Sequence, residues 1–336
     1  MVTIKDVARV AGVSPSTVSR VVRGAGKVGK KCRAHVQSVI VEMGYYPNIN
    51  ARALVSQKAE MVGIVTPNFA SPFFGSIASG VAAAAKAANY KVMMSNSSGE
   101  VDAEIEAINS LREHGCSNII LHSKLSSEET LEKLALNIDG LVIINRQVDS
   151  LAERCVWLDN VAGGRMSAEY LLKKGHTKFA VIACDRDNQD AEDRLFGIQK
   201  AISRAGLSIP TENIVIVRPS LANGYKAAEA LVKSGVEFTA LIAYNDVMAI
   251  GASNALQDLG YRIPQDVSII GFDDSLLAQI CRPNLTTMLY PVHDMAFHAT
   301  ELSIQLTTQK EAVGNRTHLF MPTLVERDSV LDMVKV

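Results

Sequence analysis

The feature that most limits the fold of this chain is a regular alternation of short apolar runs and helical stretches from Met61 onward. The apolar runs are rich in Val, Ile and Leu and lie at 61–65, 91–95, 118–122, 140–144, 179–183, 239–243 and 267–271. Alanine-rich or amphipathic segments lie between them, at 76–88, 102–113, 162–174, 192–205, 223–234 and 247–259. Apolar strands that alternate with helices are typical of parallel sheets covered by helices on both faces. The sequence therefore predicts an α/β fold with two parallel sheets, near 60–160 and 161–290, and a late crossover near 291–322.

The first 58 residues differ from the rest of the chain in charge. They hold ten Lys and Arg residues and two acidic residues, a net charge of +8. Because the whole chain has a formal net charge of −1, the remainder carries −9. A basic segment on an acidic body is attracted to a polyanion at one end only. This asymmetry predicts nucleic-acid binding by the N-terminal segment; the alternative is a solvated basic surface without a partner.

The basic segment has the pattern of a helix-turn-helix. Residues 4–11 place four apolar side chains on one helical face, and Gly12 allows a tight turn. Ser14 is a good N-cap for a second helix that starts at Pro15, a position where the missing N–H costs nothing. A third helix is predicted from about Lys31 to Met43. Two short helices joined by a Gly-containing turn are typical of the module that reads DNA.

The outer face of the second helix carries small polar side chains and one Arg. In the helix-turn-helix geometry this helix lies in the major groove. Ser16 and Arg20 then face base edges, where Arg20 can contact a guanine through two hydrogen bonds. Pro15 and Thr17 lie at the helix entrance, near a base or a phosphate. The alternative is a three-helix bundle that binds no nucleic acid.

Cysteine usage and hydropathy indicate the compartment. The five cysteines are widely spaced and include no C-x-x-C pair, which favours reduced thiols over disulfides or a zinc site. No window approaches 18 consecutive apolar residues, and the N-terminus has no apolar segment of the kind found in secretory signals. We therefore expect a cytoplasmic protein that does not enter a membrane and that needs neither a metal nor a cofactor.

Two fragments, TIKDVARVAGVSPSTVSRVV and YYPNINARAL, resemble the N-terminal region of the LacI/GalR family of bacterial transcription regulators, and the similarity continues along almost the whole chain. The resemblance implies a helix-turn-helix domain at 1–47 and a hinge helix or linker at 48–58. It also implies an effector-binding and dimerisation domain at 59–336, built from two lobes like those of periplasmic binding proteins. A homodimer that binds double-stranded operator DNA is expected, and no heptad tail extends the chain for tetramer formation.

The resemblance also implies which residues contact DNA. In the family a hinge helix enters the minor groove, and the matching apolar wedge here is Leu54. The implied contact residues are Thr3, Pro15, Ser16, Thr17, Ser19, Arg20, Asn50, Arg52 and Leu54. One departure is KVGKKCR, which replaces an acidic, Ser-capped start of the third helix. We expect this change to weaken the cap and to strengthen non-specific DNA binding.

Polar and aromatic side chains follow several predicted strands, at the edge where open α/β sheets bind ligands. The candidate effector contacts are Phe73, Asn145, Asp190, Arg194, Asn245 and Asp273. Amides, carboxylates and a guanidinium can pair with adjacent hydroxyls, and an aromatic face can cover a sugar ring. The resemblance assigns sugar contacts most directly to Arg194, Asn245 and Asp273. Each candidate has the alternative of a helix cap or loop acid, and for Asp246 and Asp274 a structural role is expected.

The fragments DAEDRL, FTALIAYNDVMAIGA and SIIGFDD resemble galactose-responsive family members most. This implies a repressor of galactose metabolism or transport genes, with galactose as effector; another hexose, a β-glucoside or a nucleobase is the alternative. An enzyme is disfavoured because the sequence has no G-x-S-x-G, P-loop or metal-ligand cluster, and the adjacent Asp273 and Asp274 make a poor acid/base pair. The basic N-terminus disfavours a periplasmic sugar carrier.

Overall fold

The computed structural model describes residues 2–22, 26, 28–45, 60–185, 189–308 and 318–334. By its internal contacts the chain divides into two units, Met1–Ala59 and Glu60–Val336. The predicted hinge segment at 48–58, with Asn50, Arg52 and Leu54, lies outside the described residues.

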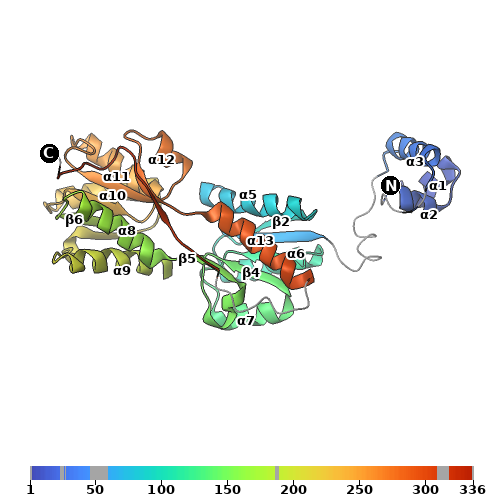
Figure 1. Cartoon of the computed structure of the whole chain (residues 1–336), viewed down its shortest axis with the longest axis horizontal. Helices are drawn as coiled ribbons and strands as arrows, with labels where there is room; N and C mark the ends of the chain where they lie inside the picture. Colours follow the sequence, from blue (N-terminus) through green and yellow to red (C-terminus); the bar gives the residue numbers. More distant parts are fainter. Residues whose placement is uncertain are drawn as a thin grey trace. The chain divides into compact units, whose positions relative to one another are not determined.

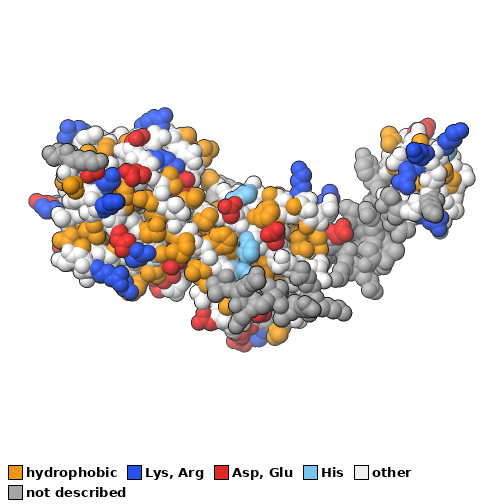
Figure 2. All heavy atoms as spheres, viewed as in Figure 1, with side chains coloured by type: hydrophobic (Ala, Val, Ile, Leu, Met, Phe, Trp, Pro, Cys, Tyr) orange, Lys and Arg blue, Asp and Glu red, His pale blue; other side chains and the backbone are white. Residues whose placement is uncertain are grey.

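The described residues of the first unit form three short helices, which confirm the predicted helix-turn-helix. The helices are α1 (Ile4–Ala11), α2 (Pro15–Val22) and α3 (Lys30–Glu42). Each helix contributes a fully buried valine to one core, namely Val7, Val18 and Val36. The face of this unit seen in Figure 2 shows more Lys and Arg than acidic side chains.

Local hydrogen bonds explain where these helices begin. Thr3 caps α1, because its Oγ1 accepts from the amide of Asp6 at 3.3 Å while its own amide donates to the Asp6 carboxylate at 3.0 Å. Gly12 has a φ of 66°, which ends α1, and Ser14 Oγ accepts from the amide of Thr17 at 3.2 Å. Gly29 gives α3 no side-chain cap, as the departure in KVGKKCR predicts.

The second unit contains two six-stranded sheets, in the strand orders β11-β5-β4-β3-β1-β2 and β12-β10-β9-β8-β6-β7. The first sheet contains β1 (Met61–Thr66), β2 (Lys91–Asn96), β3 (Asn118–Leu121), β4 (Gly140–Ile144), β5 (Cys155–Leu158) and β11 (His318–Phe320). The second contains β6 (Phe179–Cys184), β7 (Ile214–Val217), β8 (Ala240–Ala243), β9 (Ser268–Asp273), β10 (Thr286–Leu289) and β12 (Thr323–Val325). Among the described residues every neighbouring pair is parallel except β10 and β12. We call the first sheet with its helices the first lobe, and the second sheet with its helices the second lobe.

Helices cover both sheets, so the central strands are buried on both faces. The first lobe has α5 (Pro72–Ala87), α6 (Val101–Glu113), α7 (Glu128–Asn137), α13 (Val292–Thr308) and the short 3-10 helix η1 (Asp149–Arg154). The second has α8 (Asn160–Lys173), α9 (Gln189–Arg204), α10 (Leu221–Lys233), α11 (Asp246–Asp258), α12 (Leu276–Ile280) and η2 (Thr211–Asn213). In Figure 1, α13 lies beside α5 although more than 200 residues separate them in sequence.

The chain passes between the lobes three times, from β5 to α8, from β10 to α13 and from β11 to β12. The apolar runs predicted all seven of the strands they were assigned to, and the two-lobed fold is confirmed. The apolar runs did not include β5, β7, β10, β11 and β12, and the expected helical stretches did not include α7, α12 and α13. The expectation of wholly parallel sheets was also incomplete, because β12 returns from the first lobe and pairs antiparallel with β10.

Candidate functional site

Three of the predicted effector residues, Asn145, Asn245 and Asp273, lie at the carboxyl ends of strands, and Phe73, Asp190 and Arg194 lie on the helices that follow strands. Several of the six meet where the two lobes join. Asn145 follows β4 in the first lobe, and Asp190 lies in the first turn of α9 in the second lobe. Both residues are buried, with the Asp190 side chain 10% exposed. The Asn145 amide Nδ2 donates to the Asp190 carboxylate at 3.3 Å. A direct hydrogen bond therefore joins the lobes at two predicted positions.

Lys124 joins this contact and was missed by the sequence analysis. Its ammonium forms an ion pair with Asp190 at 2.8 Å and also donates to the backbone carbonyl of Asn145. Burial lowers the pKa of Lys124, while the charge of Asp190 and its hydrogen bond oppose that shift. Lys124 follows β3 in a polar loop, where a lysine resembles an ordinary surface residue in sequence. The sequence feature that could have identified Lys124 is its position three residues after the buried strand β3.

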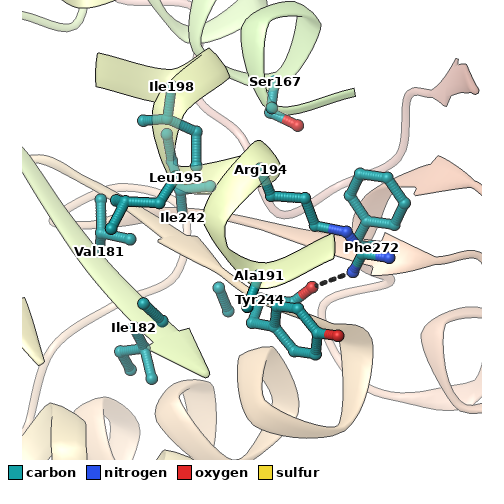
Figure 3. A pocket seen from close by; sticks show the side chains of 13 residues that line it. Ser167, Val181, Ile182, Ala191, Arg194, Leu195, Ile198, Ile242, Tyr244 and Phe272 are labelled. Atoms are coloured by element: carbon teal, nitrogen blue, oxygen red, sulfur yellow. Dashed lines mark hydrogen bonds between the residues drawn. The ribbon is translucent and has the colours of Figure 1, made fainter. Parts of the chain in front are cut away.

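Arg194 is buried in the second lobe, and its side chain points from α9 toward Phe272 (Figure 3). Its Nε donates to Asn160 Oδ1 at 2.8 Å, and its Nη1 donates to the carbonyl of Tyr244 at 2.7 Å. The guanidinium lies 3.6 Å from the ring centroid of Phe272, a cation–π contact. Burial opposes the charged form, but Tyr244, Asp273 and Asp190 raise the pKa of Arg194 above its ordinary value. Arg194 is therefore a charged donor held in one orientation.

A small apolar cavity of about 20 Å³ lies under Arg194, between α9 and the strands of the second sheet (Figure 3). Its lining includes Val181, Ile182, Ile198 and Ile242. A cavity needs about 10–15 Å³ to hold one water molecule. This space is therefore too small for a sugar.

Asp273 is close enough to Arg194 for their charges to interact, and it ends β9 with a φ of 115°. Burial raises the pKa of Asp273 well above its ordinary value; Arg194 opposes the shift, and Asp246 and Asp190 add to it. Asp274 instead forms an ion pair with Arg327 at 2.5 Å. Asp246 is fully buried and accepts from the Thr287 hydroxyl at 2.5 Å and the Ser275 amide at 2.7 Å.

The raised pKa of Asp273 predicts a pH dependence of stability. A group whose pKa is higher in the folded state stabilises the fold fully below its unfolded pKa, about 3.9, and loses that contribution as pH rises through the folded pKa. We expect the unfolding free energy of the wild type, relative to Asp273→Asn, to fall as pH rises from about 4 through the raised folded pKa of Asp273. Asn cannot ionise and tolerates positive φ. Urea unfolding of both proteins at each pH measures this difference; parallel curves would contradict it.

Aromatic rings complete the junction from both lobes. Phe73, at the start of α5, packs edge-to-face on Tyr290 with ring centroids 5.3 Å apart. Tyr290 in turn packs against Phe272 at 6.2 Å. Two buried polar atoms in this region, Asn145 Oδ1 and the Tyr290 hydroxyl, have no hydrogen-bond partner among the described residues. Buried polar groups rarely lack a partner, so these atoms are available to a ligand.

Asn245, a predicted effector residue, has a side chain that caps a helix. It is the N-cap of α11, and its Oδ1 accepts from the amide of Met248 at 3.0 Å. This bond leaves the Asn245 amide nitrogen for another partner.

A groove of about 640 Å³ opens beside the junction and is lined by both lobes. Lys124, Arg146 and Trp157 line it from the first lobe, and Asp190 and Asp193 from the second. Of the predicted effector residues only Asp190 lines this groove, while Arg194 lines the small cavity and the others line neither.

In the first unit, Pro15, Ser16 and Arg20 are exposed on α2, while Thr17 and Ser19 are partly buried. The hydroxyls of Ser14 and Ser16 are 2.7 Å apart, and those of Ser14 and Thr17 are 2.9 Å apart. Thr3, a predicted DNA contact, uses its side chain as the cap of α1. The entrance of α2 therefore presents a hydroxyl cluster beside an exposed guanidinium.

Neither a metal site nor a membrane helix is found in the described part of the chain. No group of three or more His, Cys, Asp or Glu side chains there could hold a metal ion. No helix there has the length and apolar character that a membrane crossing requires.

Comparison with known proteins identifies similar regulators. Residues 3–48 match bacterial regulatory proteins of the lacI family, and residues 168–330 match the periplasmic binding protein-like domain. The chain is 37% identical to the HTH-type transcriptional regulator GalR of Escherichia coli K12, over 98% of this chain and 96% of that protein. It is 39% identical to GalS of Salmonella typhimurium LT2, over 98% and 97%. The lac repressor dimer bound to operator and the anti-inducer ONPF is similar in structure, with a TM-score of 0.86 and 27% identity, covering 98% of this chain and 99% of that chain.

Proposed function

The chain belongs to the lacI family of bacterial regulatory proteins and is thus a DNA-binding transcriptional regulator. We propose that it is a homodimeric repressor controlled by a sugar of the galactose type. Operator DNA is bound by two groups of residues. The first unit contributes Thr3, Pro15, Ser16, Thr17, Ser19 and Arg20, and the hinge segment contributes Asn50, Arg52 and Leu54. Phe73, Asn145, Asp190, Arg194, Asn245 and Asp273 bind the sugar between the lobes. The proposed division is residues 1–47 for DNA reading, 48–58 for the hinge and 59–336 for effector binding and dimerisation.

The observation that carries the effector proposal is the set of polar groups gathered at the lobe junction. Asn145 Oδ1 and the Tyr290 hydroxyl are buried without a partner among the described residues, and Arg194 is fixed in place by Asn160 and Tyr244. A sugar hydroxyl can donate to Asn145 Oδ1, accept from an N–H of Arg194, and do either with the Tyr290 hydroxyl. A misplaced hydroxyl leaves a buried partner unpaired, at about 1–3 kcal/mol, which gives stereochemical selectivity.

The same junction supports the proposed coupling between sugar and DNA. Lys124 and Asn145 in the first lobe bond to Asp190 in the second, so a sugar that binds these groups must rearrange contacts between the lobes. A change in the angle between the lobes then separates the paired hinge segments of the dimer. Sugar and operator affinities become reciprocally coupled, typically by about 1–3 kcal/mol.

Exposed apolar side chains support the homodimer. Leu276 and Ile280 lie one helical turn apart on α12 and are 67% and 60% exposed. Large apolar side chains that neighbour each other at a surface are typical of interfaces between proteins. Sedimentation equilibrium of the wild type and of Ile280→Lys tests this: the wild type is expected to be a dimer, and a monomeric wild type would contradict it.

Arg20 is expected to specify bases. Arg20→Ala should lower affinity for operator DNA by about 1–3 kcal/mol while leaving affinity for scrambled DNA nearly unchanged, because a base contact is lost. The matched control is Arg9→Ala, since Arg9 already pairs with Asp6 at 3.2 Å on α1. Fluorescence anisotropy with both DNAs measures the ratio. Equal losses on the two DNAs would assign Arg20 to phosphate binding.

Thermal stabilisation by a panel of small molecules tests the effector. The panel holds galactose, glucose, fucose, ribose, a β-glucoside and hypoxanthine. A concentration-dependent rise in Tm with galactose is expected, because a ligand that binds only the folded state stabilises it. A rise with hypoxanthine or the β-glucoside and none with galactose would overturn the galactose proposal but keep the DNA-binding role.

A further inference from the structure

Strand β7 (Ile214–Val217) forms one edge of the second sheet and consists only of β-branched aliphatic residues. Its one neighbouring strand among the described residues is β6, and its Ile216 is 57% exposed. Proteins usually protect a sheet edge with charged residues, proline or a bulge in the edge strand. Strand β2, an edge of the first sheet, follows this rule, because it contains Lys91, Ser95 and Asn96. Strand β7 contains no charged or polar residue and no proline, so its edge is suited to pairing with another strand.

The backbone of β7 has groups that point away from its own sheet. The carbonyl oxygen of Val217 accepts from the amide of Asp185, the residue after β6, at 3.1 Å. In a strand, the backbone groups of alternate residues point to opposite sides. Val215 and Val217 therefore direct their backbone groups toward β6, and Ile214 and Ile216 direct theirs toward the outer side. Amides and carbonyls at such an edge are a template for strand addition.

The two ends of β7 carry opposite charges. Glu212 lies two residues before the strand and Arg218 directly after it, and both are exposed. Arg218 approaches Asp185 at 3.7 Å, but its side chain remains 84% exposed. Antiparallel pairing places the start of one strand beside the end of the other. In an antiparallel pair of β7 strands, Glu212 of each copy therefore lies near Arg218 of the other copy, and the edge is complementary to itself.

From these observations we propose that β7 pairs antiparallel with β7 of a second copy of this chain. Ile214 of each copy lies opposite Ile216 of the other, and the two Val215 residues lie at the two-fold axis. Ile214 and Ile216 then exchange amide–carbonyl hydrogen bonds across the contact, and their side chains form aliphatic cross-strand pairs. The same surface is used on both copies, as a two-fold contact requires.

This contact is separate from α12, whose exposed apolar side chains support the proposed homodimer. Two different contacts on one chain join dimers into tetramers. Stable interfaces between proteins bury about 1,200–2,000 Å², and a strand of four residues offers less than that. The dimers are therefore expected to associate weakly, so that tetramers form only at high protein concentration.

Sedimentation velocity of the full-length protein over a wide concentration range tests the contact. The wild type is expected to be a dimer at low concentration and a tetramer at high concentration. Ile216→Lys is expected to weaken the association of dimers by about 10- to 100-fold, because two isoleucines in each contact lose their burial and lysine protects an edge. The dimer itself and its Tm should not change. The matched control is Leu136→Lys on α7, where the replaced side chain is 84% exposed, and it should leave the association unchanged.

Charge exchange tests the antiparallel register. Glu212→Arg and Arg218→Glu are each expected to weaken the association of dimers by about 5- to 30-fold, because two ion pairs become pairs of like charge. A mixture of the two variant proteins is expected to associate about as tightly as the wild type, because each end of the contact again joins an arginine to a glutamate. A mixture no tighter than either variant alone would overturn the register.

The other outcomes separate this contact from the proposed homodimer. A wild type that stays dimeric at every concentration would overturn the β7 contact and leave the homodimer intact. If Ile216→Lys leaves the tetramer unchanged, another surface joins the dimers and the inference is wrong. If Ile216→Lys converts the dimer to a monomer, β7 is the contact within the dimer and the separate contact is wrong. A wild type that is monomeric at every concentration would overturn both contacts.

Discussion

Arg194→Lys is expected to abolish the response to sugar while operator binding persists. Arg194 is the buried cation of the lobe junction, and its planar guanidinium donates to Asn160 and Tyr244 in two directions. Lysine keeps the charge but not the planar fork of donors. Each hydrogen bond lost from a charged group costs about 1.5–3 kcal/mol, or about 10- to 150-fold in affinity. Arg194 has further N–H groups for the proposed sugar, and the loss of two such bonds would weaken sugar binding by about 10²- to 10⁴-fold.

The control for this variant is Arg165→Lys, the same substitution on α8 at a partly exposed residue that pairs with Glu169 at 2.7 Å. It should change neither sugar nor operator affinity. Calorimetry measures the sugar, anisotropy measures the operator, and the Tm without ligand shows whether the fold is intact. An Arg194→Lys protein that still releases DNA when sugar is added would exclude Arg194 from the effector site.

Gly197→Ala is expected to lower the unfolding free energy by about 3 kcal/mol, near the upper end of the usual cost of overpacking. Helices α8 and α9 are in backbone contact at this point: a Cβ at Gly197 would lie 2.1 Å from the carbonyl oxygen of Val161. The reciprocal position is Gly164, where a Cβ would lie 2.0 Å from the carbonyl oxygen of Arg194. A backbone oxygen cannot rotate away as a side chain can, so the helices must separate.

The control for this substitution is Gly75→Ala on α5, where no atom lies within 4 Å of the added Cβ. There alanine should stabilise the helix by up to about 1 kcal/mol, because glycine has the lower helix propensity. Urea unfolding measures both variants. Equal stability of Gly197→Ala and the wild type would show that α8 and α9 can move apart without loss. Because α9 carries Asp190 and Arg194, the backbone contact between α8 and α9 also sets the position of both side chains at the junction.

Much of the fold could be predicted because buried parallel strands are apolar on both faces. The run at 140–144 is an example: all five residues of β4 are buried, and the sequence shows Gly followed by four aliphatic residues. Edge strands lack this signal. In β7 (Ile214–Val217) Ile216 is 57% exposed, and the run is too short to distinguish from a loop. Strand β11 has three residues and is recognised as a strand only through its pairing with β5, about 160 residues earlier.

The candidate site was predictable to the extent that it follows from topology. Carboxyl ends of parallel strands converge, so Asn145, Arg194 and Asp273 could be selected without a structure. Lys124 and Tyr290 could not, because neither residue type is unusual in a loop and their roles depend on the approach of the other lobe. The sequence analysis predicted a sugar contact for Asp273 and a structural role for Asp274; the structure adds that Asp274 forms an ion pair with Arg327.

Operator affinity measured with and without galactose shows whether sugar binding at the lobe junction is coupled to DNA binding. The operator is first selected from a random DNA pool with the purified protein, and its Kd is then measured by anisotropy at fixed salt concentration. Saturating galactose is expected to weaken operator binding by about 5- to 150-fold, and operator DNA is expected to weaken galactose binding by the same factor. An operator Kd that is unchanged by galactose, under conditions where galactose raises the Tm, would contradict the proposed coupling between the lobe junction and the DNA-binding unit.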